Sequence, residues 1–292
     1  MKSRAVLYCV LAGLLWGASG VFSNLLTPYG FSPLQLTATR GIGSGIAIVL
    51  VVLIKDKQLF RVSVKEFLLF LVAGIMVFCT AAVYYIAIRT SSVSTAAVLM
   101  NTAPAFVMAF SVAFFGEKLT PLKFIGLLIM LVGCMLVSGV LTGLRFSFWG
   151  VLAGVGSGIC YSIYSILAKE EARRKYNPLS ATLYHFIIMG LIGLFFLDIP
   201  SYATSVAQEP AVTIPLLMGI GLVTCVTPYF LFNLAMKHVP VGTASALGIV
   251  EPMAATVYSV VFFQEKLTAA GVVGIVMVLS ACLIFAFIKE EA

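Results

Sequence analysis

An acidic side chain stands near the middle of a long apolar stretch late in the chain. In "ALGIVEPMAATVYSVVFF", residues 246–263, Glu251 is followed directly by Pro252. A carboxylate at the centre of a bilayer costs on the order of 3 kcal/mol, so this side chain should face protein. There it can bind a cationic or zwitterionic solute, exchange a proton, or pair with a basic group on another helix. We interpret Glu251 as a candidate substrate ligand and the candidate coupling residue, with a structural ion pair as the alternative.

Two side chains that can carry positive charge also lie within apolar stretches. Arg40 and His185 fall at matching positions after "SP" at 32–33 and "NP" at 177–178. Either can pair with Glu251 or bind a substrate carboxylate. The alternatives are that Arg40 extends towards lipid headgroups and that His185 is a packed hydrogen-bonding residue.

Other polar and aromatic residues recur at helical spacing in both halves of the chain. Aromatic walls with a few amide and hydroxyl groups are typical of a small-molecule pocket. For any one of these residues, a hydrogen bond between helices is the alternative role. Together with Glu251, Arg40 and His185, the residues that we expect to line a central cavity are Trp16, Ser23, Asn24, Tyr84, Asn101, Tyr161, Tyr164, Asn233 and Tyr258.

The elements that must position these residues are membrane-spanning helices. The sequence is 61% hydrophobic and 10% charged, whereas soluble domains carry about 25% charged residues. Stretches of about 20 apolar residues are long enough to span a bilayer. The expected spans are 6–26, 32–54, 66–88, 92–115, 120–140, 147–168, 178–198, 211–235, 241–263 and 268–288. We predict an all-α integral membrane protein with ten transmembrane helices.

The basic residues indicate how the chain is oriented. Most of the Lys and Arg in the connections fall on one side when alternate connections are assigned to opposite sides, and Arg89, Arg145 and Lys266 fall on the other. Cytoplasmic connections carry such an excess. The chain is therefore expected to be a multi-pass protein of the plasma membrane with both termini in the cytoplasm. The excess of basic residues on one side of the lipid bilayer accounts for the net charge of +7, and no nucleic-acid partner is expected.

An internal repeat divides the chain into two units. Residues 93–120 align without gaps on 241–268, and both segments end in Glu-Lys-Leu-Thr. Five spans per unit place the second unit in the membrane with inverted topology, an arrangement found in secondary transporters. We expect two five-helix units, 1–143 and 144–292. Pro104 and Pro252 are equivalent, and each should kink its helix.

Smaller features of the repeat predict local structure. Gly13 and Gly17 correspond to Gly154 and Gly158, which is spacing that permits close helix contact. Thr120 and Thr268 are expected to cap the next helix at its N-terminus. For Glu117 and Glu265, a structural role is expected and a role in gating is the alternative.

The order and spacing of several short motifs resemble a known family. They are "LLWG" at 14–17, "SPLQLTATR" at 32–40, "GEKLT" at 116–120, "EP" at 251–252 and "QEKLT" at 264–268. In this order they are similar to the EamA family of the drug/metabolite transporter superfamily. The resemblance covers essentially the whole chain and implies a carrier of small solutes, often an exporter of amino acids or related metabolites.

The function expected from the residues is secondary transport by alternating access. The substrates would be amino acids, amines or related zwitterionic or cationic solutes, with protons as a candidate coupling ion. No GxSxG or HExxH motif and no P-loop is present, so we expect neither an enzyme nor an ATP-driven pump, and no cofactor or metal. A lipid flippase or a channel-like protein on the same scaffold is the alternative.

Overall fold

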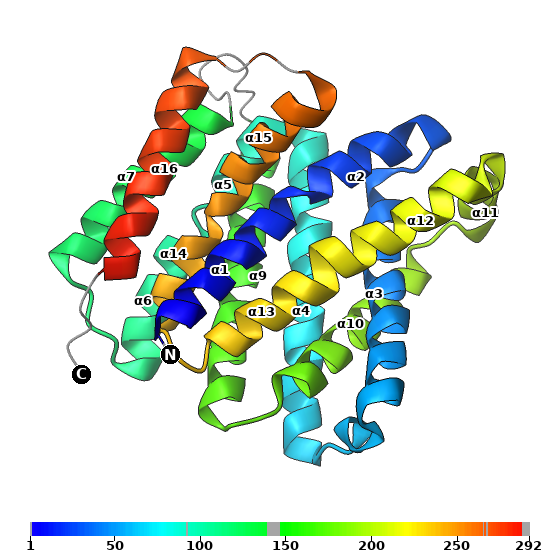
Figure 1. Ribbon diagram of the computed structural model, residues 1–292, viewed down its shortest axis with the longest axis horizontal. Helices are drawn as coiled ribbons and strands as arrows, with labels where there is room; N and C mark the ends of the chain where they lie inside the picture. The colour runs from blue at the N-terminus through cyan, green and yellow to red at the C-terminus, as the bar shows by residue number, and fades with distance from the viewer. Residues whose placement is uncertain (1, 92, 139–146, 265, 267, 288–292) are drawn as a thin grey trace.

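The computed structural model describes the chain except residues 1, 92, 139–146, 265, 267 and 288–292. Over the described part, all regular secondary structure is helical (Figure 1). Nine segments are long and apolar enough to cross a membrane: Ser3–Tyr29, Leu34–Lys55, Val64–Thr90, Thr95–Phe115, Phe148–Arg173, Pro178–Phe195, Pro210–Ala235, Val241–Phe263 and Ala269–Phe287. A further apolar helix, α7 (Pro121–Val137), is shorter, with 17 residues. The predicted class of all-α, multi-pass membrane protein is therefore confirmed, while the ten-helix inverted repeat stays a prediction.

The helices follow one another with short connections. In the first half they are α1 (Lys2–Gly17), α2 (Ser19–Leu26), α3 (Pro33–Lys55), α4 (Val64–Thr90), α5 (Val93–Met100), α6 (Ala103–Phe115) and α7. In the second half they are α9 (Phe148–Arg173), α10 (Pro178–Phe195), α11 (Ile199–Gln208), α12 (Pro210–Gly221), α13 (Thr227–Ala235), α14 (Val241–Gly248), α15 (Val250–Phe263) and α16 (Ala269–Phe287). A π-helical segment, Leu222–Val226, joins α12 to α13.

Polar side chains begin several of these helices by accepting hydrogen bonds from backbone N–H groups that the helix leaves unpaired. Ser32 and Gln35 form a reciprocal capping box at the start of α3. Thr120 accepts from the N–H of Lys123, and Thr268 accepts from the N–H of Gly271 at 3.0 Å. The predicted caps at Thr120 and Thr268 are confirmed.

The two expected proline kinks are present as breaks between helices. Helix α5 ends at Met100 and α6 begins just before Pro104, while α14 ends at Gly248 and α15 begins just before Pro252. A proline lacks the N–H that continues a helical ladder, so each helix restarts at its proline. Similar breaks at Ala18 and in the π-helical segment were not predicted from the sequence.

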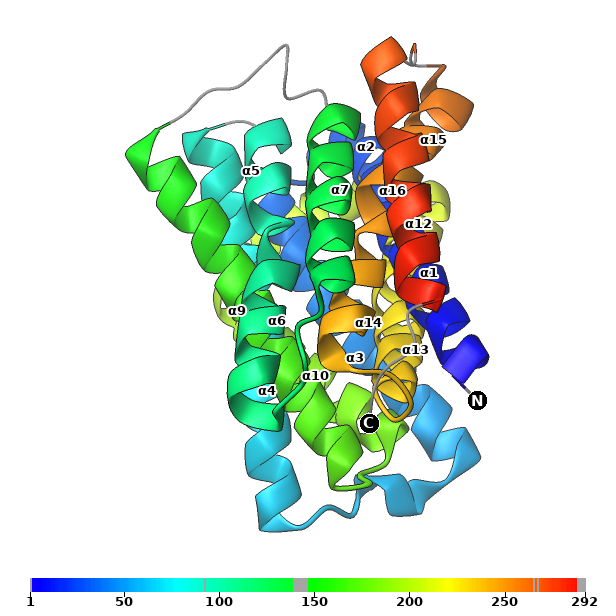
Figure 2. The same cartoon turned by 90° about the vertical axis from the view of Figure 1, so that its left-hand side faces the viewer.

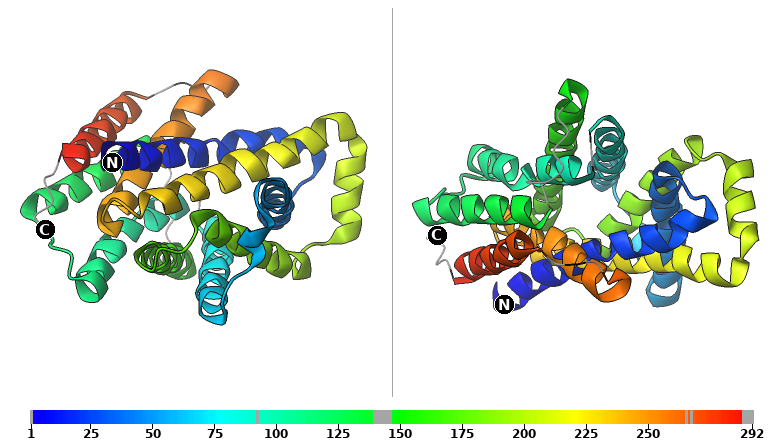
Figure 3. Two further views of the ribbon diagram at one scale, coloured as in Figure 1. Left: turned by 60° about the horizontal axis from the view of Figure 1, so that its bottom comes forward. Right: turned by 90° about the horizontal axis from the view of Figure 1, so that it is seen from above.

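Helices of the first half pair with helices of the second half. Helix α3 packs on α10, α4 on α9 and α7 on α16 (Figures 1 and 3). Helix α1 runs beside α13 and crosses the break between α14 and α15. The break that carries Glu251 is therefore covered by protein instead of lipid.

Small residues make these crossings close, as the repeated glycines predicted. A Cβ atom on Gly13 would lie 3.1 Å from the carbonyl oxygen of Gly248, and one on Gly17 would lie 2.7 Å from that of Glu251. In the second half, Gly154 packs on the side chain of Leu99 and Gly158 approaches the carbonyl oxygen of Met100. The predicted close approach is confirmed at all four glycines.

The contact at Gly17 yields a stability test. Gly17→Ala adds a methyl group with no space between α1 and α15, and we expect it to destabilise the protein by about 1–3 kcal/mol. Gly20→Ala, one turn further on, meets nothing within 4 Å and gains helix propensity, so it should leave stability unchanged or slightly raised. Thermal unfolding of the purified variants in detergent measures both, and equal melting temperatures would contradict the close contact.

Candidate functional site

Glu251 lies in the first turn of α15, directly after the helix break. Helix α1 covers this turn: Gly17 approaches the backbone of Glu251 and Ala255, and the hydroxyl of Tyr258 donates to the carbonyl oxygen of Leu14 at 3.3 Å. Ala255 and Tyr258 share the helical face of Glu251 by their spacing, and this face is in contact with α1.

Aromatic rings from two other helices surround Trp16 on α1. Its ring centroid is 6.3 Å from that of Tyr161 on α9, 5.3 Å from that of Tyr229 and 5.4 Å from that of Phe232, both on α13. Edge-on arrangements of this kind are favourable for aromatic pairs. Tyr161 and Tyr229 also interact electrostatically with Glu251, so this aromatic cluster faces the carboxylate.

Arg40 reaches the same region from α3. Its Nε donates to the Sγ of Cys225 at 3.2 Å, in the π-helical segment. The guanidinium interacts electrostatically with Glu251 and Tyr229. Among the described residues, however, no ion pair or hydrogen bond joins Arg40 to Glu251. The two opposite charges are close enough to interact but remain unpaired.

The charged and phenolic side chains around Glu251 lie deep among the helices. Arg40, Tyr84 and Tyr161 each interact electrostatically with Glu251. All four side chains nevertheless keep an intermediate solvent exposure. We call this group, with Trp16, Tyr229 and Phe232, the central cluster.

His185 lies elsewhere, one layer behind the central cluster. Its Nε2 is 2.9 Å from Oε1 of Glu171 on α9. The ring also contacts Tyr164, whose hydroxyl donates to Oδ1 of Asn233 at 2.9 Å. Asn233 in turn donates to Thr182 at 3.1 Å. Arg40 and His185 were the two candidate partners of Glu251. Among the described residues, Glu251 forms an ion pair with neither.

The remaining predicted cavity residues make local contacts. Asn101 donates from Nδ2 to the carbonyl oxygen of Ala97 at 2.7 Å, at the break between α5 and α6. In α2, the carbonyl oxygen of Ser23 accepts from Thr27 at 2.7 Å, and Asn24 is exposed. These three residues are not in the central cluster.

Sequence reasoning missed Phe232, Cys225 and Glu171. Phe232 and Cys225 look like ordinary apolar residues of a span, and no signal in one sequence separates them from the core. Glu171 was assigned to a basic connection after residue 168, but α9 continues to Arg173 and buries it. The pattern of apolar residues at Ile166, Leu167 and Ala172 was the available signal for that longer helix.

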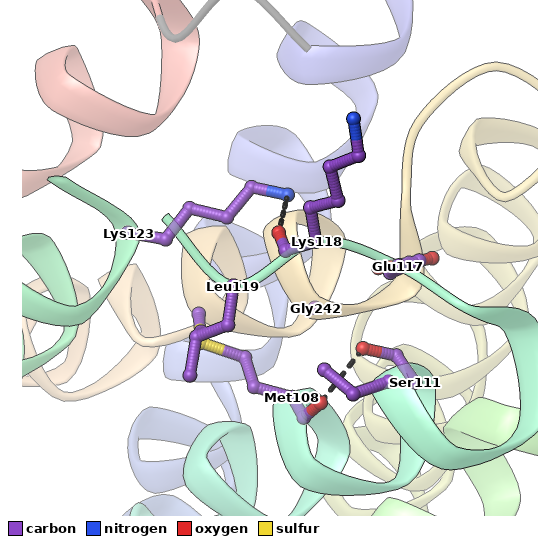
Figure 4. Close-up of a pocket in the computed structure, with 8 residues that line it drawn as sticks. Met108, Ser111, Glu117, Lys118, Leu119, Lys123 and Gly242 are labelled. Carbon is purple, nitrogen blue, oxygen red and sulfur yellow. Dashed lines mark hydrogen bonds between the residues drawn. The ribbon is translucent and has the colours of Figure 1, made fainter. Parts of the chain in front are cut away.

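Glu117 makes a contact between the two halves at the end of the molecule that carries connections 56–63, 116–120 and 174–177, here called the basic end. Its Oε1 accepts from the N–H of Val241, the first residue of α14, at 3.0 Å. Next to it, a Cβ on Gly242 would lie 3.0 Å from Cγ of Met108 on α6 (Figure 4). Helices α6 and α14 thus touch at the basic end. The predicted counterpart Glu265 lies outside the described residues.

At the opposite end, the matching helix halves are separated. Helices α5 and α15 stand apart in Figures 2 and 3, whereas α6 and α14 lie side by side. Within the described part of the chain, the matching helix halves are therefore in extensive contact at the basic end, between α6 and α14.

Comparison with known proteins identifies the class of molecule to which this helical scaffold belongs, a membrane transporter. The model of the EamA-like transporter family matches residues 3–139 and 148–287. The chain belongs to the EamA-like transporter family.

Relatives and solved structures agree with this assignment. An uncharacterized transporter of Archaeoglobus fulgidus is 30% identical over 71% of this chain and 72% of its own length. The uncharacterized transporter YwfM of Bacillus subtilis is 25% identical over 95% and 92%. The threonine/homoserine exporter RhtA of Escherichia coli is 24% identical over 68% of this chain and 64% of its own. A solved crystal structure covers 97% of the chain with a TM-score of 0.79 at 19% identity, which shows the shared fold.

The contact of Glu117 with α14 can be tested by hydrogen exchange. Glu117→Ala removes a charged acceptor, a loss of about 1.5–3 kcal/mol, so amides at the start of α14 should exchange roughly 10- to 100-fold faster. Glu117→Gln keeps an oxygen acceptor and should show a smaller change. Exchange mass spectrometry on peptides covering 241–248 measures this, and unchanged exchange in Glu117→Ala would show that the contact does not hold the helix.

Proposed function

We propose that the protein is a secondary-active exporter of small zwitterionic or cationic metabolites, such as amino acids and amines. It would act in the plasma membrane, with both termini in the cytoplasm, by alternating access. The observation that carries the proposal is the pair of opposite, unpaired charges of Arg40 and Glu251 beside aromatic rings. A solute with its own carboxylate and ammonium group can pair with both of these side chains at once.

Electrostatics favours a zwitterion over an ion of one sign. Each protein charge lies deep among the helices with only partial access to water, where an unpaired charge is costly. A bound amino acid would present its carboxylate to Arg40 and its ammonium to Glu251, and so neutralise both. The rings of Trp16, Tyr161 and Tyr229 would add cation–π attraction for the ammonium group.

The named relative supports this class of substrate. RhtA exports threonine and homoserine, and both molecules carry a carboxylate and an ammonium group on one carbon. At 24% identity the similarity supports the direction of transport and the type of solute, and it does not select one amino acid.

Alternating access is supported by the unequal ends of the molecule. Contact between α6 and α14 at the basic end, with α5 and α15 apart, is what an outward-facing state requires. The family model matches the chain twice, at 3–139 and 148–287, which supports two related units of five helices, 1–143 and 144–292. Inverted repeats provide two such gates around one site.

Glu251 is also our candidate for coupling. A carboxylate that alternately binds a proton and a substrate ammonium couples the two movements, and intramembrane acids serve as proton carriers in many transporters.

A lipid flippase would need a polar path along the lipid-facing surface. A groove of about 300 Å³ does open between α3 and α10. Its lining consists of glycines and apolar side chains, including Gly41, Ile46 and Phe186. Such a groove suits an acyl chain and supplies nothing for a headgroup, so we favour a soluble metabolite as the substrate.

Substitution of Glu251 tests coupling. We expect Glu251→Gln to keep the fold but to abolish the dependence of transport on the pH gradient in liposomes, because an amide cannot exchange a proton. Glu170→Gln, which alters a carboxylate bound to Arg173 and Arg174 at the basic end, is the matched control and should retain the dependence. Gradient-driven transport that persists in Glu251→Gln would rule out this role.

Substitution of Arg40 tests the substrate class. We expect Arg40→Gln to weaken binding of amino acids by roughly 2–5 kcal/mol, at least about 30-fold, while binding of the corresponding amines changes little. Arg89→Gln, at the exposed end of α4, is the control. Thermal-shift titration of the purified proteins with amino acids and matched amines measures the difference. An equal loss for both ligand types would show that Arg40 does not contact a carboxylate.

A further inference from the structure

A second acid–base pair is buried outside the central cluster. Glu171 on α9 and His185 on α10 are joined at 2.9 Å, with side-chain exposures of 4% and 0%. The other described ion pairs, from Arg173 and Arg174 to Glu170, have partly exposed arginines. Two ionisable groups are thus held in contact away from water near the basic end.

Each partner has a second polar atom with no hydrogen-bond partner. These atoms are Oε2 of Glu171 and Nδ1 of His185, and both are fully buried. Buried polar atoms are nearly always satisfied, so an exception calls for an explanation. An imidazole uses both nitrogens as donors only when protonated, and a carboxyl gains a donor when it takes up a proton. A neutral imidazole that donates through Nε2 keeps a lone pair on Nδ1, and a carboxylate keeps lone pairs on Oε2, so the pair can take up one further proton at either atom.

Aromatic side chains make the ring contacts of the imidazole. From α4, Phe70 packs edge-on to the imidazole. From α9, Tyr164 contacts the ring and interacts electrostatically with Glu171. Tyr176 packs edge-on against Phe70, and Tyr184 on α10 stacks on it. Tyr229 and Asn233 on α13 contact Tyr164. The Nζ of Lys169 donates to the carbonyl oxygens of Met236 and Val239.

Tyr164 links the pair to the central cluster. Its ring is 5.6 Å from His185 on one side and 5.4 Å from Tyr229 on the other, measured between centroids. It is also in contact with Tyr161 and Phe232. A change in charge at His185 acts on a ring that packs directly against the central cluster.

We propose that Glu171 and His185 form a proton-binding site, distinct from Glu251, through which the pH at the basic end controls transport. The proton comes from water at that end. When it is bound, His185 is an imidazolium that attracts the Glu171 carboxylate and holds α9 to α10 behind Tyr164. When it leaves, the attraction is lost and Tyr164 is freed to move with the central cluster. The effect on transport rests on the proposed function, whereas proton binding does not.

Proton binding can be measured without transport, because the chain contains two histidines. The second, His238, is exposed, so His238→Gln leaves His185 as the single histidine. We expect nitrogen NMR of ¹⁵N-histidine-labelled His238→Gln protein in lipid nanodiscs to show a reversible protonation step as pH is varied. The step should change when Glu171→Gln is added and persist when Glu251→Gln is added. A His185 signal that does not respond to pH, or a step unaffected by Glu171→Gln, would overturn the proposal.

Transport in liposomes tests the consequence. We expect Glu171→Gln to lose the response of exchange to the pH of the compartment facing the basic end, while Glu170→Gln keeps it. An undiminished response in Glu171→Gln would overturn control by this pair. If the wild-type protein moves no amino acid or amine, the proposed function fails, and the NMR result still decides whether the pair binds a proton.

Discussion

The structure depends on one constraint: neither a charge nor an unpaired backbone group can face hydrocarbon without a large free-energy cost. The turn at Glu251 contains both, because the helix restarts at Pro252 and carries a carboxylate. Helix α1 removes the cost by covering the turn, and it can do so only because Gly13 and Gly17 let its backbone come within contact distance. The site and its cover are therefore a single packing unit.

The repeated elements of the chain carry unequal chemistry. Pro104 and Pro252 break equivalent helices, yet Glu251 has Ala103 as its counterpart. Arg40 and His185 are equivalent in the sequence, but Arg40 faces the central cluster and His185 pairs with Glu171. Shared architecture thus provides two breaks, and differences between equivalent residues give one cluster with two unpaired charges and one buried acid–base pair.

Much of the fold could be predicted because its signals are local. The length of the apolar runs, the caps at Thr120 and Thr268, the breaks at the prolines and the close contacts at glycines each follow from a few neighbouring residues. The break at Ala18 could not be predicted, because no residue there forces it. The π-helical segment at 222–226 directly precedes α13, which has Pro228 in its first turn. A proline there removes the hydrogen bond to the carbonyl of Thr224, so this proline was the available signal for the irregular turn.

By itself, the sequence determined the class of protein, the repeat and the set of side chains able to carry charge inside the membrane. These properties depend on composition and on spacing along the chain. The tertiary structure alone decided which of those side chains meet. The sequence was compatible with a pair between Glu251 and either Arg40 or His185, and Glu251 forms neither pair. His185 instead pairs with Glu171, which lies near the end of α9, a helix longer than expected. Partner choice depends on how far each helix is rotated and shifted against its neighbours, and one helical turn of difference exchanges one partner for another.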